Sequence, residues 1–209
     1  MYNLFVKKKI LIATKNPGKI VEIKKFLEDL PLETVSLKDV GINNEVKETR
    51  KTYKENSLLK ALFYSKISKL PVISDDGGLE IKALKKAPGV KSRRWLGFEA
   101  TDKELIEHMK KVSKELPENN RTAYFKTVIT FALPNGKYFQ SAGSVKGEIA
   151  KKPLLKLFKG YPYRSFFFLP KINKFYHESQ LSKNEERVYN HRYKAISKLK
   201  PVIEKELEL

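Results

Sequence analysis

The chain has 209 residues, with 43 Lys and Arg against 24 Asp and Glu, so its formal net charge is +19. Its 41% of hydrophobic residues is enough for a packed core and argues against wholesale disorder. Without Cys the chain cannot form disulfides, Cys-ligated zinc or a cysteine nucleophile, and no apolar run is long enough to span a bilayer.

The positive charge attracts polyanions such as nucleotides and nucleic acid. The lysines are spread along the whole chain, however, which is also typical of solvated helix faces. The N-terminus, residues 1–9, is apolar and then basic, which is the reverse of a secretory signal. We therefore expect a cytoplasmic protein without a membrane segment.

The first predicted elements are a strand, a turn and a helix in immediate succession. Lys9–Thr14 is an apolar run typical of a buried strand, and Lys15–Gly18 is a dense turn signal. Apolar residues then recur at helical spacing over Ile20–Leu30.

The turn is a candidate phosphate-binding site, because the free backbone amides at the start of a helix, the helix dipole and nearby lysines all favour a bound anion. We expect Asn16 to donate its side-chain amide there, and Lys15 and Lys19 to add positive charge. The pattern is not a P-loop, and many ordinary turns between a strand and a helix look like it. An alternative is therefore a turn without a ligand.

A second helix is predicted from about Thr52 to Leu70, ended by Pro71. Thr52 and Glu55 form a capping box, which gives Glu55 a structural role. Glu48 lies just upstream in the loop, where its carboxylate can reach a metal ion. The alternative is an ordinary surface glutamate.

A short strand, Val72–Ser74, is predicted to run into a turn at Asp75–Gly78. Carboxylates at the C-terminal end of a strand lie where α/β proteins place ligands, and Mg²⁺ prefers oxygen ligands. An Asp-Gly turn without any ligand is the equally weighted alternative.

The rest of the chain indicates a mixed sheet with helices around it. A helix is predicted over Asp102–Leu116, and a hairpin from Thr122 to Phe139 that turns at Asn135-Gly136. Tyr161–Leu169 is strongly aromatic, as in a core, although one ring could stack on a purine. The last helix should be kinked or ended by Pro201.

The segment Asn190-His191-Arg192 stands at the head of that last helix. Helix N-terminal donors, an imidazole and a guanidinium together could hold a base edge or a phosphate. A His-Arg pair is otherwise a common surface feature.

Taken in order, these segments resemble the inosine triphosphate pyrophosphatase family, which removes non-standard purine nucleotides. That family shows Ala-Thr-Gly-Asn-x-x-Lys, then Glu-Thr-Gly-x-Thr-Phe-x-Glu-Asn-Ala-x-x-Lys-Ala, Asp-Asp-Ser-Gly-Leu and Ala-Pro-Gly-Val. The matching segments here are Ala13–Lys19 (ATKNPGK), Glu48–Ala61 (ETRKTYKENSLLKA), Asp75–Leu79 (DDGGL) and Ala87–Val90 (APGV), followed by the later strands Arg121–Ile129 and Gly143–Ile149.

The resemblance implies one pyrophosphatase domain over residues 1–209, an α/β fold with a mixed central sheet flanked by helices, two lobes and a cleft. It implies a homodimer that cleaves inosine, deoxyinosine and xanthosine triphosphates to the monophosphate and pyrophosphate with Mg²⁺. Asp76 becomes the catalytic carboxylate and a metal ligand, and Glu48 the second ligand. Substrate contacts are assigned to Thr14, Lys15, Asn16, Lys19, Gly77, Tyr161, Tyr163, Arg164, His191 and Arg192.

The C-terminal third departs from the family pattern. Tyr161-Pro162-Tyr163-Arg164 stands for Phe-Gly-Tyr-Asp, so an acceptor has become an obligate donor. Glu185-Glu186-Arg187 stands for Glu-Glu-Lys, one residue closer to His191, with Asn190 in place of Ser, and Gly77 also replaces Ser. Our hypothesis is a retained pyrophosphohydrolase with an altered or relaxed base preference.

Two other interpretations stay open. The scaffold could be a catalytically impaired protein that binds nucleotides or nucleic acid, which the charge of +19 favours. The related septum-inhibitor nucleotide pyrophosphatases, which prefer modified pyrimidines, share the architecture, but the inosine-type motifs rank them last.

Overall fold

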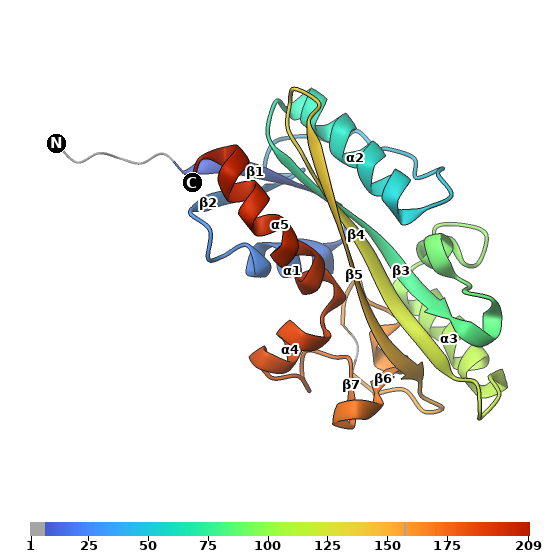
Figure 1. Cartoon of the computed structure of the whole chain (residues 1–209). Helices are drawn as coiled ribbons and strands as arrows, with labels where there is room; N and C mark the ends of the chain where they lie inside the picture. Colours follow the sequence, from blue (N-terminus) through green and yellow to red (C-terminus); the bar gives the residue numbers. More distant parts are fainter. Residues whose placement is uncertain (1–6, 157) are drawn as a thin grey trace. The chain divides into compact units, whose positions relative to one another are not determined.

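The computed structural model describes residues 7–156 and 158–209 (Figure 1). Over these residues the predicted mixed α/β fold is confirmed. The sheet has seven strands in the order β2-β1-β3-β4-β5-β6-β7. The strands are β1 (Lys8–Ala13), β2 (Leu32–Ser36), β3 (Val72–Ile81), β4 (Thr122–Ala132), β5 (Tyr138–Ile149), β6 (Phe167–Leu169) and β7 (Lys174–Phe175). The α-helices are α1 (Pro17–Phe26), α2 (Tyr53–Ser68), α3 (Asp102–Glu115), α4 (Lys183–Tyr189) and α5 (His191–Leu207).

The chain divides into two compact units. Unit 1 comprises the chain up to Asp76, Val128–Ser141 and Ala195–Leu209, and unit 2 comprises Gly77–Thr127 and Ala142–Lys194. The strands β3, β4 and β5 and the helix α5 each contribute residues to both units. Each unit has its own hydrophobic core.

In unit 1 the first predicted strand and helix are confirmed. β1 pairs in parallel with β2 and with β3, where Leu11 lies opposite Val72. Apolar residues of β1 pack with Ala61 and Tyr64 of α2, which covers this part of the sheet (Figure 1). Buried parallel strands of this kind read as continuous apolar runs, which is why β1 was visible in the sequence.

The α2 helix begins where the capping box places it. Thr52 Oγ1 accepts a hydrogen bond from the Glu55 amide, and Glu55 accepts one from the Thr52 amide in return. The helix ends at Ser68, earlier than Pro71, because Lys69 adopts the left-handed conformation at φ 59° and closes the last turn on the Ser65 carbonyl.

The predicted turn at Asp75–Gly78 is wrong, because β3 continues through these residues to Ile81. The two glycines meet a packing requirement instead of a turn. A Cβ at Gly77 would overlap the Lys126 carbonyl oxygen and lie 2.9 Å from Thr127 Cα, and one at Gly78 would overlap Ser92 Oγ. Glycine inside a strand therefore marks the close approach of neighbouring backbone.

This close approach gives a first prediction. Gly77→Ala forces β3 away from β4 and lowers the free energy of unfolding by about 1–3 kcal/mol. Thermal or urea denaturation measures the change. An unchanged midpoint would mean that β4 withdraws without cost.

In unit 2 the predicted helix over residues 102–116 is confirmed as α3, with its own capping box between Thr101 and Glu104. The predicted hairpin is confirmed as β4 and β5, which both units share, and its connecting turn, with Gly136 at φ 88°, belongs to unit 1. The aromatic segment forms core, since Phe166 and Phe167 are fully buried.

Of the two outcomes expected at Pro201, the end of the helix is wrong, because α5 continues to Leu207. A kink there stays a prediction. Proline removes one helical hydrogen bond. Leu199 before it and Ile203 after it are both buried, and this burial on either side of Pro201 offsets the loss. Among the described residues, no helix is long and apolar enough to cross a membrane.

Candidate functional site

The turn before α1 is closed by its own side chains. Asn16 is the N-cap, and its Oδ1 accepts a hydrogen bond from the Lys19 amide at 3.1 Å. Thr14 Oγ1 accepts one from the Asn16 amide at 3.2 Å. Thr14 and Asn16 therefore fix the shape of the turn from which the Lys19 side chain extends.

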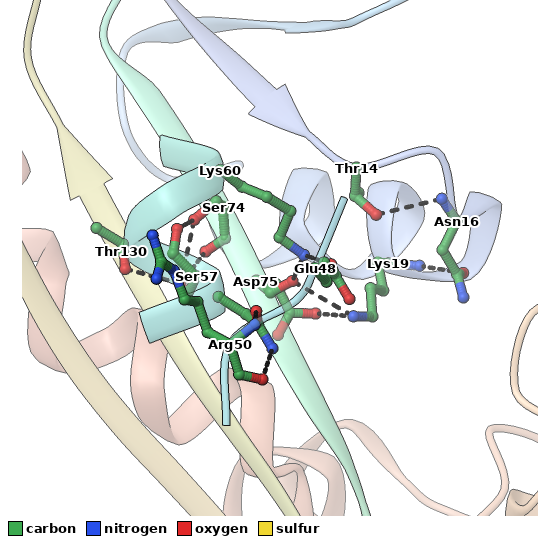
Figure 2. Close-up of polar contacts among 11 residues, drawn as sticks. Thr14, Asn16, Lys19, Glu48, Arg50, Ser57, Lys60, Ser74, Asp75 and Thr130 are labelled. Carbon is green, nitrogen blue, oxygen red and sulfur yellow. Dashed lines mark hydrogen bonds and ion pairs between the residues drawn. The ribbon is translucent and has the colours of Figure 1, made fainter. Parts of the chain in front are cut away.

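The Lys19 side chain joins this turn to β3. Its ammonium lies 3.1 Å from Asp75 Oδ2 and 3.4 Å from the Asp75 carbonyl oxygen. Asp75 is fully buried and the Lys19 side chain is 16% exposed, so the contact is shielded from water. The structure thus brings the predicted phosphate-binding turn before α1 together with the acidic segment Asp75-Asp76 within unit 1 (Figure 2).

Lys60 of α2 is the second cation that contacts Asp75. We call Lys19, Glu48, Lys60, Asp75 and Asp76 the buried cluster. Its ammonium donates to the Asp75 carbonyl oxygen at 2.8 Å and forms an ion pair with Glu48. Burial lowers the pKa of Lys60, but the nearby carboxylates of Glu48 and Asp76 outweigh that effect, so the pKa is raised. Lys60 is therefore a buried, permanently charged group.

Sequence reasoning missed Lys60 although a signal was present. The buried face of α2 carries Ser57, Lys60, Ala61 and Tyr64, at the spacing of an apolar stripe. A lysine in such a stripe requires a buried acceptor or carboxylate. The family motif matched at Glu48–Ala61 already includes this lysine.

Glu48 is held near Lys60 by the loop that carries it. The fully buried Asn56 accepts a hydrogen bond from the Arg50 amide at 3.0 Å and donates one to the Arg50 carbonyl at 3.4 Å. These bonds attach the loop to the first turns of α2. Glu48, predicted as a metal ligand, thus lies at the site as the ion-pair partner of Lys60 (Figure 2).

Asp76 follows Asp75 in β3 and is 4% exposed. Desolvation raises the pKa of its carboxyl to about 6, because it outweighs the lowering by Lys60, while Glu48 adds to the rise. A carboxylate with a pKa close to neutrality is suited to accepting a proton from water.

The carboxylate oxygens of Glu48 and Asp76 are suitable ligands for a hard cation such as Mg²⁺. The charges of Glu48 and Asp76 act on each other and both act on Lys60. Among the described residues, no group of three or more His, Cys, Asp or Glu could hold a metal by itself. Mg²⁺ is usually bound through one or two carboxylates plus substrate phosphates, so a two-carboxylate site fits its chemistry.

Two other predicted contacts have different surroundings. Lys15 is half-exposed, and its ammonium is 3.4 Å from Glu45 Oε2. Gly77 offers only backbone atoms to a substrate, because a Cβ there would overlap the Lys126 carbonyl oxygen.

The remaining predicted substrate contacts, which are the candidates for contacting the base, lie in unit 2, where three of them come together. The Arg164 guanidinium carbon lies 3.8 Å from the ring centre of Tyr161 and 4.5 Å from that of Tyr176. Arg192 donates to the Tyr161 hydroxyl at 3.0 Å. Both arginines are buried. Tyr161 is therefore in contact with two buried guanidinium groups.

The other two base-contact candidates are placed by core contacts. The Tyr163 hydroxyl donates to the Ser92 carbonyl, and burial raises the pKa of that hydroxyl. His191 Nδ1 lies 2.9 Å from the Tyr176 hydroxyl, and its ring stacks on Phe125. Whether these side chains contact a base stays a prediction.

Comparison with known proteins gives a consistent result. The model of the Ham1 family matches residues 10–202. The chain is 38% identical over 201 residues to a dITP/XTP pyrophosphatase of Caldanaerobacter subterraneus, covering 96% of this chain and 98% of that protein. It is 33% identical to the dITP/XTP pyrophosphatase of Bacillus subtilis, covering 96% and 100%. The solved structure of the Staphylococcus aureus Ham1 protein superposes with a TM-score of 0.77 at 33% identity, covering 95% and 100%.

Proposed function

Because the chain belongs to the Ham1 family, we infer that it is a nucleoside triphosphate pyrophosphohydrolase, which cleaves non-standard purine nucleoside triphosphates to a monophosphate and pyrophosphate. The observation that supports this most directly is the buried cluster in unit 1. Two ammonium groups, of Lys19 and Lys60, converge on Asp75, next to a carboxylate whose pKa is raised to about 6.

In the proposed reaction, water attacks the α-phosphorus and the bond to the pyrophosphate oxygen breaks. Asp76 accepts the proton of the attacking water. Lys19 and Lys60 exchange their present partners for phosphate oxygens and offset the charge of the leaving pyrophosphate. The turn at Thr14 and Asn16 adds amide donors at the N-terminus of α1.

Glu48 and Asp76 are the residues that would hold Mg²⁺ in this proposal. The ion, when bound, neutralises phosphate charge and lowers the pKa of a bound water. Glu48 is paired with Lys60 in this structure, so a metal ion held by Glu48 and substrate phosphate held by Lys60 would favour each other. A homodimer and a cytoplasmic location complete the proposal, and both rest on the family resemblance.

Base recognition is the part of the proposal that departs from the family. We assign it to Tyr161, Arg164 and Arg192, with Tyr163 and His191. Since Arg164 is an obligate donor where relatives carry an acceptor, it cannot read a purine N–H, and we expect weaker discrimination against standard purines.

One experiment tests the activity and the base preference together. The protein is incubated with inosine, xanthosine and the standard triphosphates, and pyrophosphate and monophosphate are assayed in parallel. We expect equal amounts of both products with Mg²⁺, none after chelation, and measurable turnover of standard purines. Strict preference for inosine and xanthosine would contradict the relaxed preference. Salt-dependent oligonucleotide binding without cleavage would favour the impaired binding protein.

A further inference from the structure

Three buried hydroxyl groups connect the helix that carries Lys60 to the strands beneath it. Ser57 of α2, Ser74 of β3 and Thr130 of β4 are all fully buried in unit 1. Ser57 Oγ lies 2.7 Å from Thr130 Oγ1 and 3.1 Å from Ser74 Oγ, and Ser74 Oγ donates to the Ser57 carbonyl at 2.5 Å (Figure 2). We call these three residues the hydroxyl clamp.

The hydroxyl clamp can be fully hydrogen-bonded with one consistent direction. Gln140 Nε2 donates to Thr130 Oγ1 at 2.9 Å, and also to the Lys54 carbonyl in the first turn of α2. Thr130 can then donate to Ser57, Ser57 to Ser74, and Ser74 to the Ser57 carbonyl. A satisfied buried network is directional and fixes one arrangement of its elements, which apolar contacts alone do not.

The position of the hydroxyl clamp relates it to the site. Ser57 lies one helical turn before Lys60 on the same face of α2. Ser74 directly precedes Asp75, whose carbonyl accepts the Lys60 hydrogen bond at 2.8 Å. The clamp therefore fixes α2 to β3 one residue away from the point where the Lys60 ammonium meets the acidic segment.

We propose that Ser57, Ser74 and Thr130 are positioning residues that hold Lys60 in register with Asp75 and Asp76. None of the three touches substrate in this proposal, which rests on the proposed function. Without the clamp, α2 can shift on the sheet by a fraction of a helical turn, and a displacement of about 1 Å at a reacting centre can lower turnover by about 10²-fold.

The test compares three variants with the wild type. Ser57→Ala restores the Ala of the family pattern but removes the hydroxyl that Ser74 and Thr130 share as a partner in this chain, and Thr130→Ser keeps a hydroxyl on β4. Ser113→Ala is the matched control, because Ser113 is a buried α3 serine of unit 2 whose Oγ donates to the Lys110 carbonyl. We expect kcat for pyrophosphate release to fall by about 10- to 100-fold in Ser57→Ala, with KM changed less, and to stay near the wild-type value in the other two.

A merely structural role would lower thermal stability in Ser57→Ala and Ser113→Ala alike while leaving kcat unchanged below the unfolding transition. That result would overturn the proposal. Should Ser57→Ala fail to fold, Thr130→Val tests the same link from β4, with the same expected fall in kcat.

Hydrogen exchange distinguishes failure of the clamp from failure of the proposed function. In Ser57→Ala, or in Thr130→Val, amides of β3 around Asp75 should exchange at least 10-fold faster than in the wild type, whereas Ser113→Ala leaves them unchanged. This readout needs no catalysis. A wild type that cleaves no triphosphate would refute the function, and unchanged exchange in β3 would refute the clamp.

Discussion

Asp76→Asn lowers Mg²⁺-dependent pyrophosphate release by about 10²- to 10⁴-fold, which is the range expected when a general base is lost. The amide cannot accept the proton of water, and it is a poorer metal ligand than a carboxylate. Steady-state release of pyrophosphate at saturating triphosphate measures the effect. An Asp76→Asn protein that folds and turns over at the wild-type rate would remove Asp76 from the mechanism.

The same variant should be more stable than the wild type at neutral pH. Burial raises the pKa of Asp76 to about 6, so the folded state binds more protons than the unfolded state between pH 4 and 6. The free energy of unfolding therefore falls as pH rises through this window, by up to about 3 kcal/mol for a shift of about two pKa units. Asn avoids this cost.

Thermal denaturation of the metal-free protein at several pH values checks the sign. The wild type and Asp76→Asn should have similar midpoints below pH 4, and the variant should melt higher above pH 6. A variant that is less stable than the wild type at pH 8 would mean that the attraction between Asp76 and Lys60 exceeds the cost of burying the carboxylate.

The part of the site that could be predicted from the sequence lies in local segments. The strand before Thr14, the helix that follows the turn at Asn16 and the capping box at Thr52 each follow from residues a few positions apart. Such signals depend on hydrogen bonds within one turn of chain, which the sequence order already fixes.

The parts that were missed depend on contacts between distant segments. Asp75–Gly78 has the composition of a turn, but Gly77 and Gly78 are required by backbone near Lys126 and by Ser92. Lys60 resembled a surface lysine because its partners, Glu48 and the Asp75 carbonyl, are brought to it by the fold. The helical spacing of Lys60 indicates a buried side chain, but only the fold identifies its partners.

The aromatic segment shows the same limit in unit 2. Tyr161 and Tyr163 are two residues apart and chemically identical. The first contacts two guanidinium groups, whereas the second donates to the Ser92 carbonyl. Composition therefore identified the aromatic cluster but could not say which ring contacts the two arginines.

Lys60→Met should lower turnover by about 10²- to 10³-fold, since a preorganised charge at the phosphates is lost. Met keeps most of the buried chain volume but removes the charge. The variant leaves Glu48 and Asp76 without the cation that attracts both, and breaking a buried pair in this way is costly. Because the Glu48 side chain is 30% exposed and water can solvate it, the loss of stability should be about 1–3 kcal/mol.

A second substitution separates the two roles of Lys60. Adding Glu48→Gln to Lys60→Met removes the stranded carboxylate and should recover part of the lost stability, as a double-mutant cycle would record. It should not recover turnover, because the phosphates still lack the ammonium and Gln is a weaker metal ligand. If the double variant regains both, Lys60 serves only to neutralise Glu48. If Lys60→Met alone turns over normally, the triphosphate is held without α2, and the convergence of Lys19 and Lys60 on Asp75 is a feature of folding alone.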